Sequence, residues 1–466
     1  MLERRKNVDF QAQPHCNNLM KKQEALKPSE TNNLKKRAIS SGIWVSAGYG
    51  LQQVLRFGSN LVLTRLLFPE AFGLMAIIQT VMIGLTMMSD IGIQPSIVQN
   101  KRGNEPIFLN TAWTIQVIQG LLIFLVVLVT APFFAVFYHE PLLAHLLPVV
   151  GLGAIISGFN STKLATANRE LIMAKVTKIE IFTYVISLIV TILLAWIYQS
   201  VWSLVWGTLL GSFLKMLASH FVLPGIRNHF TWEKPAVNAL FGFGTWIFIS
   251  SALTFLAGEG NKLFVAKLLD VRMLSFFTLA STMCMIFWQT IVQLAGKILL
   301  PAYSEVIRQN PERLNKVLTK TRMAMILPGW SIAVFFVFFG DQFMSLVYDS
   351  RYQQSGPMLQ ILAMGSLAGI IGWSYVGILM AKGMVRSSTV LLALQIVVQV
   401  AAILIGNHFY QAHGVIIALA TINWLLYPAY SYVHIKAGVW QPKIDIPFLI
   451  ASVGVILIAI KTINYV

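Results

Sequence analysis

The chain has 466 residues, of which 56% are hydrophobic and only 11% are charged, and its mean hydropathy is +0.69. Because about a quarter of the residues of a soluble domain are charged, this composition excludes an ordinary soluble protein and indicates a polytopic membrane protein. The net charge of +17 would suggest nucleic acid binding in a soluble chain, but here the basic residues lie mostly between apolar runs, where they report orientation. Cys16 and Cys284 are too few and too differently placed to predict a disulfide, a metal site or a cofactor.

Thirteen apolar segments are long enough to cross a bilayer, which takes about 20 residues of helix. They are residues 38–64, 71–97, 109–136, 142–165, 176–198, 200–222, 237–258, 273–299, 322–345, 357–381, 387–406, 413–433 and 446–464. The break at Gln199 and Ser200 is so short that it predicts a tight helical hairpin. Residues 1–37 are polar and basic and lack helical periodicity, so we expect a disordered cytoplasmic tail.

The basic residues predict how these segments are oriented. With the N-terminus in the cytoplasm, 27 of the 35 Lys and Arg residues fall on the cytoplasmic side and six fall outside. Cytoplasmic loops carry the excess of Lys and Arg in membrane proteins, so this bias predicts an N-terminus inside the cell. We expect a multi-pass membrane protein without an extracellular domain.

A short internal repeat indicates two halves of the same topology. Leu61, Arg65, Leu66 and Leu67 match Leu263, Lys267, Leu268 and Leu269 at a constant offset of 202 residues, which spans six segments. Parallel repeats of six helices occur in transporters that bind substrate between their halves. We therefore predict an N-terminal lobe over 38–224, a cytoplasmic loop over 225–236, a C-terminal lobe over 237–435 and an accessory helix over 446–464.

Polar side chains at membrane depth are the candidates for function. Gln52, Arg56 and Asn60 are spaced by four residues and therefore share one face of the first helix. Lys262 follows the seventh helix, and the eighth helix carries another stripe with the same spacing, made of Gln289, Gln293 and Lys297. Charged groups are costly in lipid and mark functional sites by default. These stripes predict a cationic cavity between the lobes, suited to a phosphate or pyrophosphate.

Structural roles for the same residues stay open. Arg56 could be locked in an ion pair with Glu259 or Asp90, and Lys297 could extend to the membrane surface instead of lining a cavity. Asp90 and Glu259 are the two plausible carboxylates for coupling to protons or cations, although Asp90 could instead cap a helix. Glutamines in membrane helices often join helices and bind no substrate.

The segment around the first two helices resembles the Wzx-like polysaccharide-transporter branch of the multidrug/oligosaccharidyl-lipid/polysaccharide exporter superfamily. The resemblance is carried by LKKRAIS at 34–40, by LTRLLFPEAFG at 63–73 and by SDIG at 89–92, and it covers about residues 34–440. It implies an all-α fold of two six-helix bundles in an inverted V, as in multidrug exporters. It also implies a flippase for undecaprenyl-pyrophosphate-linked sugars. This chain departs from the family pattern at Asn261, Lys262 and Asp270.

From the polar stripes and the resemblance together, we expect a transporter, not an enzyme, that flips a lipid-linked oligosaccharide for surface polysaccharide biosynthesis. Its expected partners are this glycan substrate and membrane lipids, with a polysaccharide polymerase and glycosyltransferases as further candidates, and no nucleic acid. The alternative is a proton- or sodium-coupled drug or cation antiporter of the same superfamily. A membrane glycosyltransferase or polymerase would need an acidic catalytic motif or a large outer loop, and neither is visible.

Overall fold

The computed structural model describes residues 28–294 and 299–462, and this part of the chain is helical without strands. The first helices are α2 (Pro28–Leu66), α3 (Pro69–Ser89), α4 (Ile93–Gln99), α5 (Pro106–Tyr138), α6 (Leu143–Gly158), α7 (Lys163–Arg169), α8 (Met173–Tyr198) and α9 (Trp202–Phe221). The later ones are α10 (Lys234–Gly258), α11 (Gly260–Leu268), α12 (Val271–Leu294), α13 (Leu300–Gln309), η2 (Pro311–Arg313), α14 (Leu314–Val347), η3 (Ser350–Tyr352), α15 (Ser355–Trp373), α16 (Ile378–Ala381), α17 (Val385–Lys436) and α18 (Pro442–Thr462).

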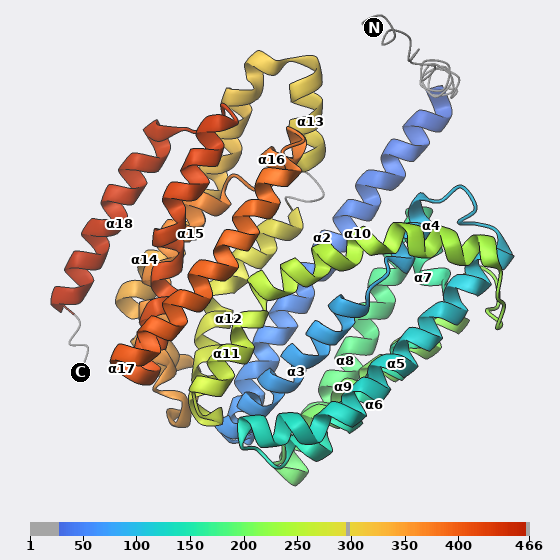
Figure 1. Ribbon diagram of the computed structural model, residues 1–466, viewed down its shortest axis with the longest axis horizontal. Coiled ribbons are helices and arrows are strands. Elements are labelled where there is room, and N and C mark those ends of the chain that lie inside the picture. The colour runs from blue at the N-terminus through green and yellow to red at the C-terminus, as the bar shows by residue number, and fades with distance from the viewer. Residues whose placement is uncertain (1–27, 295–298, 463–466) are drawn as a thin grey trace, which may run out of the picture.

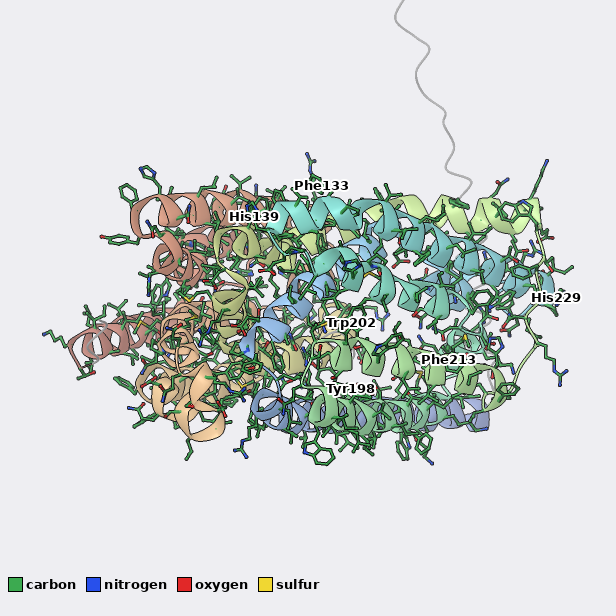
Figure 2. The ribbon with its side chains drawn as sticks, turned by 90° about the horizontal axis from the view of Figure 1, so that it is seen from below. Phe133, His139, Tyr198, Trp202, Phe213 and His229 are labelled. Atoms are coloured by element: carbon green, nitrogen blue, oxygen red, sulfur yellow. The ribbon has the colours of Figure 1, made fainter. Side chains whose placement is uncertain are left out.

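Helices of this protein are long and apolar enough to cross a membrane. Within the described residues seven helices meet the length and hydropathy required of a span, or eight if the bent pair α6 and α7 is one span. Large apolar side chains such as Phe133 and Tyr198 lie on the outside of the first helices, where both are more than 60% exposed (Figure 2). An apolar surface of this kind is stable in lipid and not in water. The protein is therefore an all-α polytopic membrane protein.

Helix α17 is two antiparallel segments joined at a sharp break. Tyr410 and Gln411 leave the helical conformation, and Gln411 has a φ of 50°. A Cβ atom on Gly406 would collide with the carbonyl group of Gly414, so the two segments pack backbone to backbone at the turn. This break lies within the boundary predicted between residues 407 and 413. The hairpin predicted at Gln199 is also present, since α8 ends at Tyr198 and α9 begins four residues later.

The helices form two groups that meet at one end of the molecule, opposite the end at which α2 begins (Figure 1). In the first group α5 packs on α6, and α8 packs on α9 and α2; in the second group α15 packs on α14 and α17. Helix α10 crosses from one group to the other. Its first turns bury Ala236 and Leu240 against Ile97 and Phe108 of the first group, whereas near its other end the carbonyl of Ala257 accepts a hydrogen bond from Gln395 of α17.

The helix boundaries follow the predicted repeat. Helix α2 ends at Leu66 and α11 ends at Leu268, while α3 begins at Pro69 and α12 begins at Val271, so both boundaries are displaced by 202 residues. Helices α3 and α12 contact each other directly, and Gly73 of α3 leaves room for the backbone of Val271. Equivalent elements of the repeat, α3 and α12, thus contact each other.

The prediction of a disordered tail over residues 1–37 is wrong for its last ten residues. Helix α2 begins at Pro28, so it continues well beyond the apolar run that starts at residue 38. Extending an existing helix is far easier than nucleating one, and proline fits the first position of a helix. The remainder of the predicted tail, residues 1–27, lies outside the described residues.

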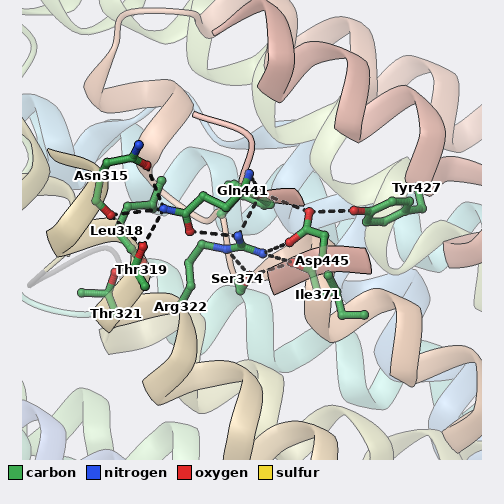
Figure 3. Close-up of polar contacts among 11 residues, drawn as sticks. Asn315, Leu318, Thr319, Thr321, Arg322, Ile371, Ser374, Tyr427, Gln441 and Asp445 are labelled. Atoms are coloured by element: carbon green, nitrogen blue, oxygen red, sulfur yellow. Dashed lines mark hydrogen bonds and ion pairs between the residues drawn. The ribbon is translucent and has the colours of Figure 1, made fainter. Parts of the chain in front are cut away.

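The last helix is held to the second group by buried charges (Figure 3). Arg322 of α14 and Asp445 of α18 form an ion pair of 2.5 Å, and neither side chain is exposed. The Asp445 carboxylate also accepts hydrogen bonds from Tyr375, at 3.1 Å, and Tyr427, at 2.6 Å. A buried ion pair is stable only when further hydrogen bonds satisfy both partners, and here they do. Helix α18, predicted as an accessory segment, is therefore firmly attached at its first turn.

Candidate functional site

A polar crevice lies between α2 of the first group and α12 of the second. Its volume is about 10 Å³, and its walls are Gln53, Arg56, Phe57, Asn60, Thr282, Met283, Ile286 and Gln289. At this size it holds one water molecule at most. The Gln53 amide nitrogen lies 3.5 Å from the Gln289 amide oxygen across the crevice, and donates a shorter hydrogen bond of 2.9 Å to the Tyr49 hydroxyl.

Arg56 is the charged group of this crevice. Its side chain is exposed, and within the described part of the chain the guanidinium has no ion pair or hydrogen bond. Glu259, the first partner considered for it, is instead paired with Lys262 at 2.5 Å. Asp90, the second, accepts a hydrogen bond of 2.7 Å from the backbone amide of Gly92. The structure therefore contains neither of the ion pairs that would give Arg56 a purely structural role.

The other predicted site residues are only partly brought together. Asn60 and Gln289 line the crevice with Arg56, whereas Gln52 is half-buried on α2 and is not part of its walls. Lys262 lies on α11 and is neutralised by Glu259. The side chain of Gln293 and the whole of Lys297 lie outside the described residues.

The residues of the crevice are suited to binding an anion. The guanidinium of Arg56 offers five N–H donors in a planar fork, and the amide groups of Gln53, Asn60 and Gln289 can offer two donors each. A phosphate oxygen accepts such bonds readily, and charge-assisted ones are about twice as strong as neutral ones. Because the crevice holds one water molecule at most, a phosphate could bind these side chains only after α2 and α12 move apart, and it would then contact both halves of the chain.

Beyond the crevice, at the end of α2, the two groups are sealed by hydrogen bonds to helix ends. Arg351 of η3 donates to the backbone carbonyls of Thr64, at 3.2 Å, and Arg65, at 2.8 Å. The Tyr352 hydroxyl donates to the carbonyl of Leu67 at 3.2 Å. The last carbonyls of a helix carry partial negative charge and lack partners within the helix. A cation of the second group thus caps a helix of the first.

The same arrangement recurs at the end of α5. Lys267 of α11 donates to the carbonyl of Phe137 at 2.5 Å, and the Tyr138 hydroxyl donates in the opposite direction, to the carbonyl of Leu263 at 3.2 Å. Glu70 and Arg272 add an ion pair at 3.8 Å between α3 and α12. We call these contacts, with those of Arg351 and Tyr352, the helix-end seal.

Removing the cap on α2 should loosen this seal. In an Arg351→Gln variant the charge that meets the carbonyls of Thr64 and Arg65 is lost, and a charge at a helix end contributes about 0.3–1 kcal/mol, or up to about 2 kcal/mol when partly buried. We expect a two- to thirtyfold rise in the rate at which a membrane-impermeant thiol reagent labels a cysteine placed at Phe72. The same substitution at Arg313, on the other side of the molecule, should leave that rate unchanged. Equal labelling in all variants would contradict a role for Arg351 in the seal.

Acid should tighten the seal through Glu140, in the turn after α5. Partial burial and the nearby carboxylates Asp270 and Glu70 raise the pKa of Glu140 above its ordinary value of 4.5. The sealed state therefore binds the proton more tightly than an open, solvated state does. This contribution is complete below pH 4.5 and is lost as the pH rises through the raised value. We expect labelling of the Phe72→Cys protein, relative to labelling of a free thiol at the same pH, to increase with pH over that range. The same protein carrying Glu140→Gln should lack this dependence.

The sequence alone did not reveal the seal. Arg351 was counted only as one of six basic residues outside the membrane, and its carbonyl partners lie 286 and 287 residues earlier in the chain. Gln53 and Thr282 were also missed as parts of the crevice. The sequence signal for Gln53 was its position next to Gln52 on the same helix. No sequence signal pointed to Thr282.

The chain is similar to several known proteins. The chain is 22% identical to the lipopolysaccharide biosynthesis protein WzxC of Escherichia coli (strain K12) over 450 residues, which is 91% of this chain and 89% of that protein. Its fold is similar to that of the lipid II flippase MurJ in an inward closed conformation, with a TM-score of 0.67 and 14% identity over 91% of this chain and 93% of the other. It is equally similar to a multidrug resistance MATE family transporter of the MOP superfamily in its inward-facing conformation, with a TM-score of 0.67 and 15% identity over 83% of this chain and 94% of the other.

The family described as "Polysaccharide biosynthesis protein" matches residues 62–357. This range begins in α2, includes all residues of the helix-end seal, and contains the residues of α12 that line the crevice. Because it covers well over half of the chain, the protein belongs to the polysaccharide biosynthesis protein family, in the Wzx-like branch that the sequence resembles.

Proposed function

We propose that this protein flips an oligosaccharide linked to undecaprenyl pyrophosphate across the bacterial inner membrane, for surface polysaccharide biosynthesis. Family membership supports transport in polysaccharide biosynthesis, and the similarity to a lipid II flippase supports a lipid-linked substrate. The observation that carries the proposal is Arg56, an exposed and unpaired cation, within the described residues, where the two halves meet.

The mechanism we propose is alternating access. The N-terminus lies in the cytoplasm, so the helix-end seal is at the outer surface, and the lobes open toward the cytoplasm. The pyrophosphate enters between the lobes and binds Arg56, with Asn60 and Gln289 as additional donors, while the lipid tail remains in the bilayer. Breaking the seal would then expose the bound glycan to the outside. Lys262 could join the site only by exchanging its ion pair with Glu259 for one with the pyrophosphate, and Gln52, Gln293 and Lys297 remain candidates further along the same stripes.

The second candidate is a proton- or sodium-coupled antiporter for drugs or cations. That function needs carboxylates that can bind a proton or cation in turn. Asp90 caps the turn at Gly92, and Glu259 is held by Lys262. The unpaired group in the crevice is a cation, which favours an anionic substrate over a cationic one.

A lipid analysis of cells lacking the protein tests the choice between these functions. If it is a flippase, undecaprenyl-linked sugar should accumulate, and it should be inaccessible to a membrane-impermeant glycan-modifying reagent in intact spheroplasts. Re-expression should restore both the pool and its accessibility. An unchanged pool, together with new sensitivity to cationic compounds, would reject the flippase and support the antiporter.

A further inference from the structure

A large cavity in the second group of helices is separate from the crevice, with which it shares no lining residue. It has a volume of about 1120 Å³, slightly above the usual range of about 300–1,000 Å³ for small-molecule pockets. Its floor is formed by α14 and α15, and its walls by α18 on one side and the second segment of α17 on the other. We call it the α17–α18 groove. It lies in the half of these helices that is remote from the buried Arg322–Asp445 pair.

The walls of the groove are apolar over most of its length. Ile417 of α17 and Leu457 of α18 are about half exposed there, and Met364 and Ile361 lie on the floor. Water is excluded from the hydrocarbon core of a membrane, so an apolar groove that opens to lipid takes up hydrocarbon chains. The chemistry of its interior thus specifies an acyl or isoprenoid chain but does not choose between them.

Polar side chains at one end of the groove distinguish between these two kinds of lipid. Asp341 and Gln342 at the end of α14, Gln354 before α15 and His413 of α17 all line it there. These four side chains are exposed and make no hydrogen bond or ion pair within the described part of the chain. Lys461 is not a lining residue, but it is an exposed cation that lies between the lining residues Ile460 and Thr462 of α18, at the same end. The floor of the groove therefore offers a carboxylate, and an ammonium group lies beside its α18 wall.

We propose that the α17–α18 groove binds a phospholipid with a zwitterionic phosphoethanolamine headgroup. The acyl chains occupy the apolar interior. The headgroup ammonium meets the Asp341 carboxylate, and the phosphate accepts hydrogen bonds from Lys461 and from the amide groups of Gln342 and Gln354. With the orientation proposed above, this lipid belongs to the outer leaflet.

Charge argues against the lipid-linked glycan as the occupant. A pyrophosphate would bring at least two negative charges next to Asp341, whose own charge has no partner of opposite sign on its helix turn. Like charges at this distance repel, and the repulsion is stronger near a membrane than in bulk water. A phosphoglycerol headgroup has the phosphate but lacks the ammonium group, so it would leave Asp341 unmatched. The groove is thus a site for a membrane lipid and is separate from the transport substrate.

The test is native mass spectrometry of the full-length protein, released from nanodiscs of equal parts phosphatidylethanolamine and phosphatidylglycerol. We expect the wild type to retain more phosphatidylethanolamine than phosphatidylglycerol. In an Asp341→Asn variant the ratio of the two retained lipids should fall about tenfold, as expected for the loss of one charge-assisted hydrogen bond. A Glu312→Gln variant, which removes an exposed carboxylate on the other side of the molecule, is the matched control and should behave as the wild type.

A second pair of variants tests the groove itself. Ile417→Trp fills it and should abolish retention of the lipid, whereas Ile450→Trp, at an exposed position of α18 outside the groove lining, should not. Equal retention of both phospholipids by the wild type would overturn the proposal, as would an unchanged preference in Asp341→Asn. Displacement of the retained lipid by undecaprenyl phosphate at equimolar concentration would reassign the groove to the isoprenoid tail. Because these readouts measure lipid binding and not transport, they are independent of whether the protein is a flippase.

Discussion

An Arg56→Ala variant should lose transport by at least about tenfold while the protein remains in the membrane at its normal level. The guanidinium is the unpaired cation of the crevice, and hydrogen bonds to charged groups contribute about 1.5–3 kcal/mol each. Since 1.4 kcal/mol corresponds to a factor of ten, losing one or two such bonds to a pyrophosphate gives at least that reduction. The measurement is the amount of lipid-linked glycan that becomes accessible outside spheroplasts per unit of membrane-inserted protein.

Two controls separate charge from geometry. Arg56→Lys keeps the charge but cannot form the planar two-point contact, so it should retain part of the activity. Arg313→Ala removes an exposed arginine in the turn before α14, which has no ion pair among the described residues, and should transport normally. Because Arg56 has no partner to leave unsatisfied, its removal should not lower the stability of the protein. Normal transport by Arg56→Ala would refute its role in substrate binding.

An Asp445→Ala variant should be the most destabilised of the single variants considered. It leaves the guanidinium of Arg322 fully buried without its counter-charge, and breaking a buried pair in this way costs about 3–5 kcal/mol. Tyr375 and Tyr427 would lose their acceptor as well. The midpoint of thermal unfolding of the purified protein in detergent measures the effect, and α18 should become susceptible to proteolysis before the rest of the chain.

The matched control replaces both charges at once. In an Arg322→Met, Asp445→Leu double variant no charge is left buried, so most of the lost stability should return. A double-mutant cycle then yields the coupling energy between the two residues. If the double variant were as unstable as Asp445→Ala, the hydrogen bonds of the surrounding polar side chains, and not the ion pair, would hold α18 in place.

Length and hydropathy located most of the helices, because about 20 apolar residues have few other stable states. They did not give the number of spans: thirteen segments were predicted, whereas the described residues contain seven helices that meet the criteria for a span, or eight if α6 and α7 form one. Part of the difference arises because α17 contains two of the predicted segments, 387–406 and 413–433. The repeat at Arg65 and Lys267 could also be read from the sequence, since each is the penultimate residue of a helix, and the next helix begins after two further residues. The extension of α2 back to Pro28 could not be predicted, because residues 28–37 are polar and are helical only as a continuation of an apolar helix.

Contacts between residues far apart in the chain could not be predicted from the sequence. The charge count placed Arg322 among the basic residues flanking a cytoplasmic loop, yet it is fully buried by partners 49 to 123 residues further along the chain. The crevice shows the intermediate case. The spacing of Arg56 and Asn60 puts them on one helix face, but only the fold brings that face next to Gln289. The fold also pairs Lys262 with Glu259, so Lys262 is not an unpaired cation as the sequence suggested.

The ion pair between Glu70 and Arg272 has a consequence for which lobes can assemble. The two residues occupy equivalent positions of the repeat, 202 residues apart, and form an ion pair at 3.8 Å. If two copies of the first lobe met in this way, Glu70 would oppose Glu70; two copies of the second lobe would oppose Arg272 with itself. Each such pairing places like charges together and is disfavoured. The pair is half exposed, so its contribution is at most about 1 kcal/mol, but its sign favours the pairing of a first lobe with a second lobe over the pairing of two identical lobes.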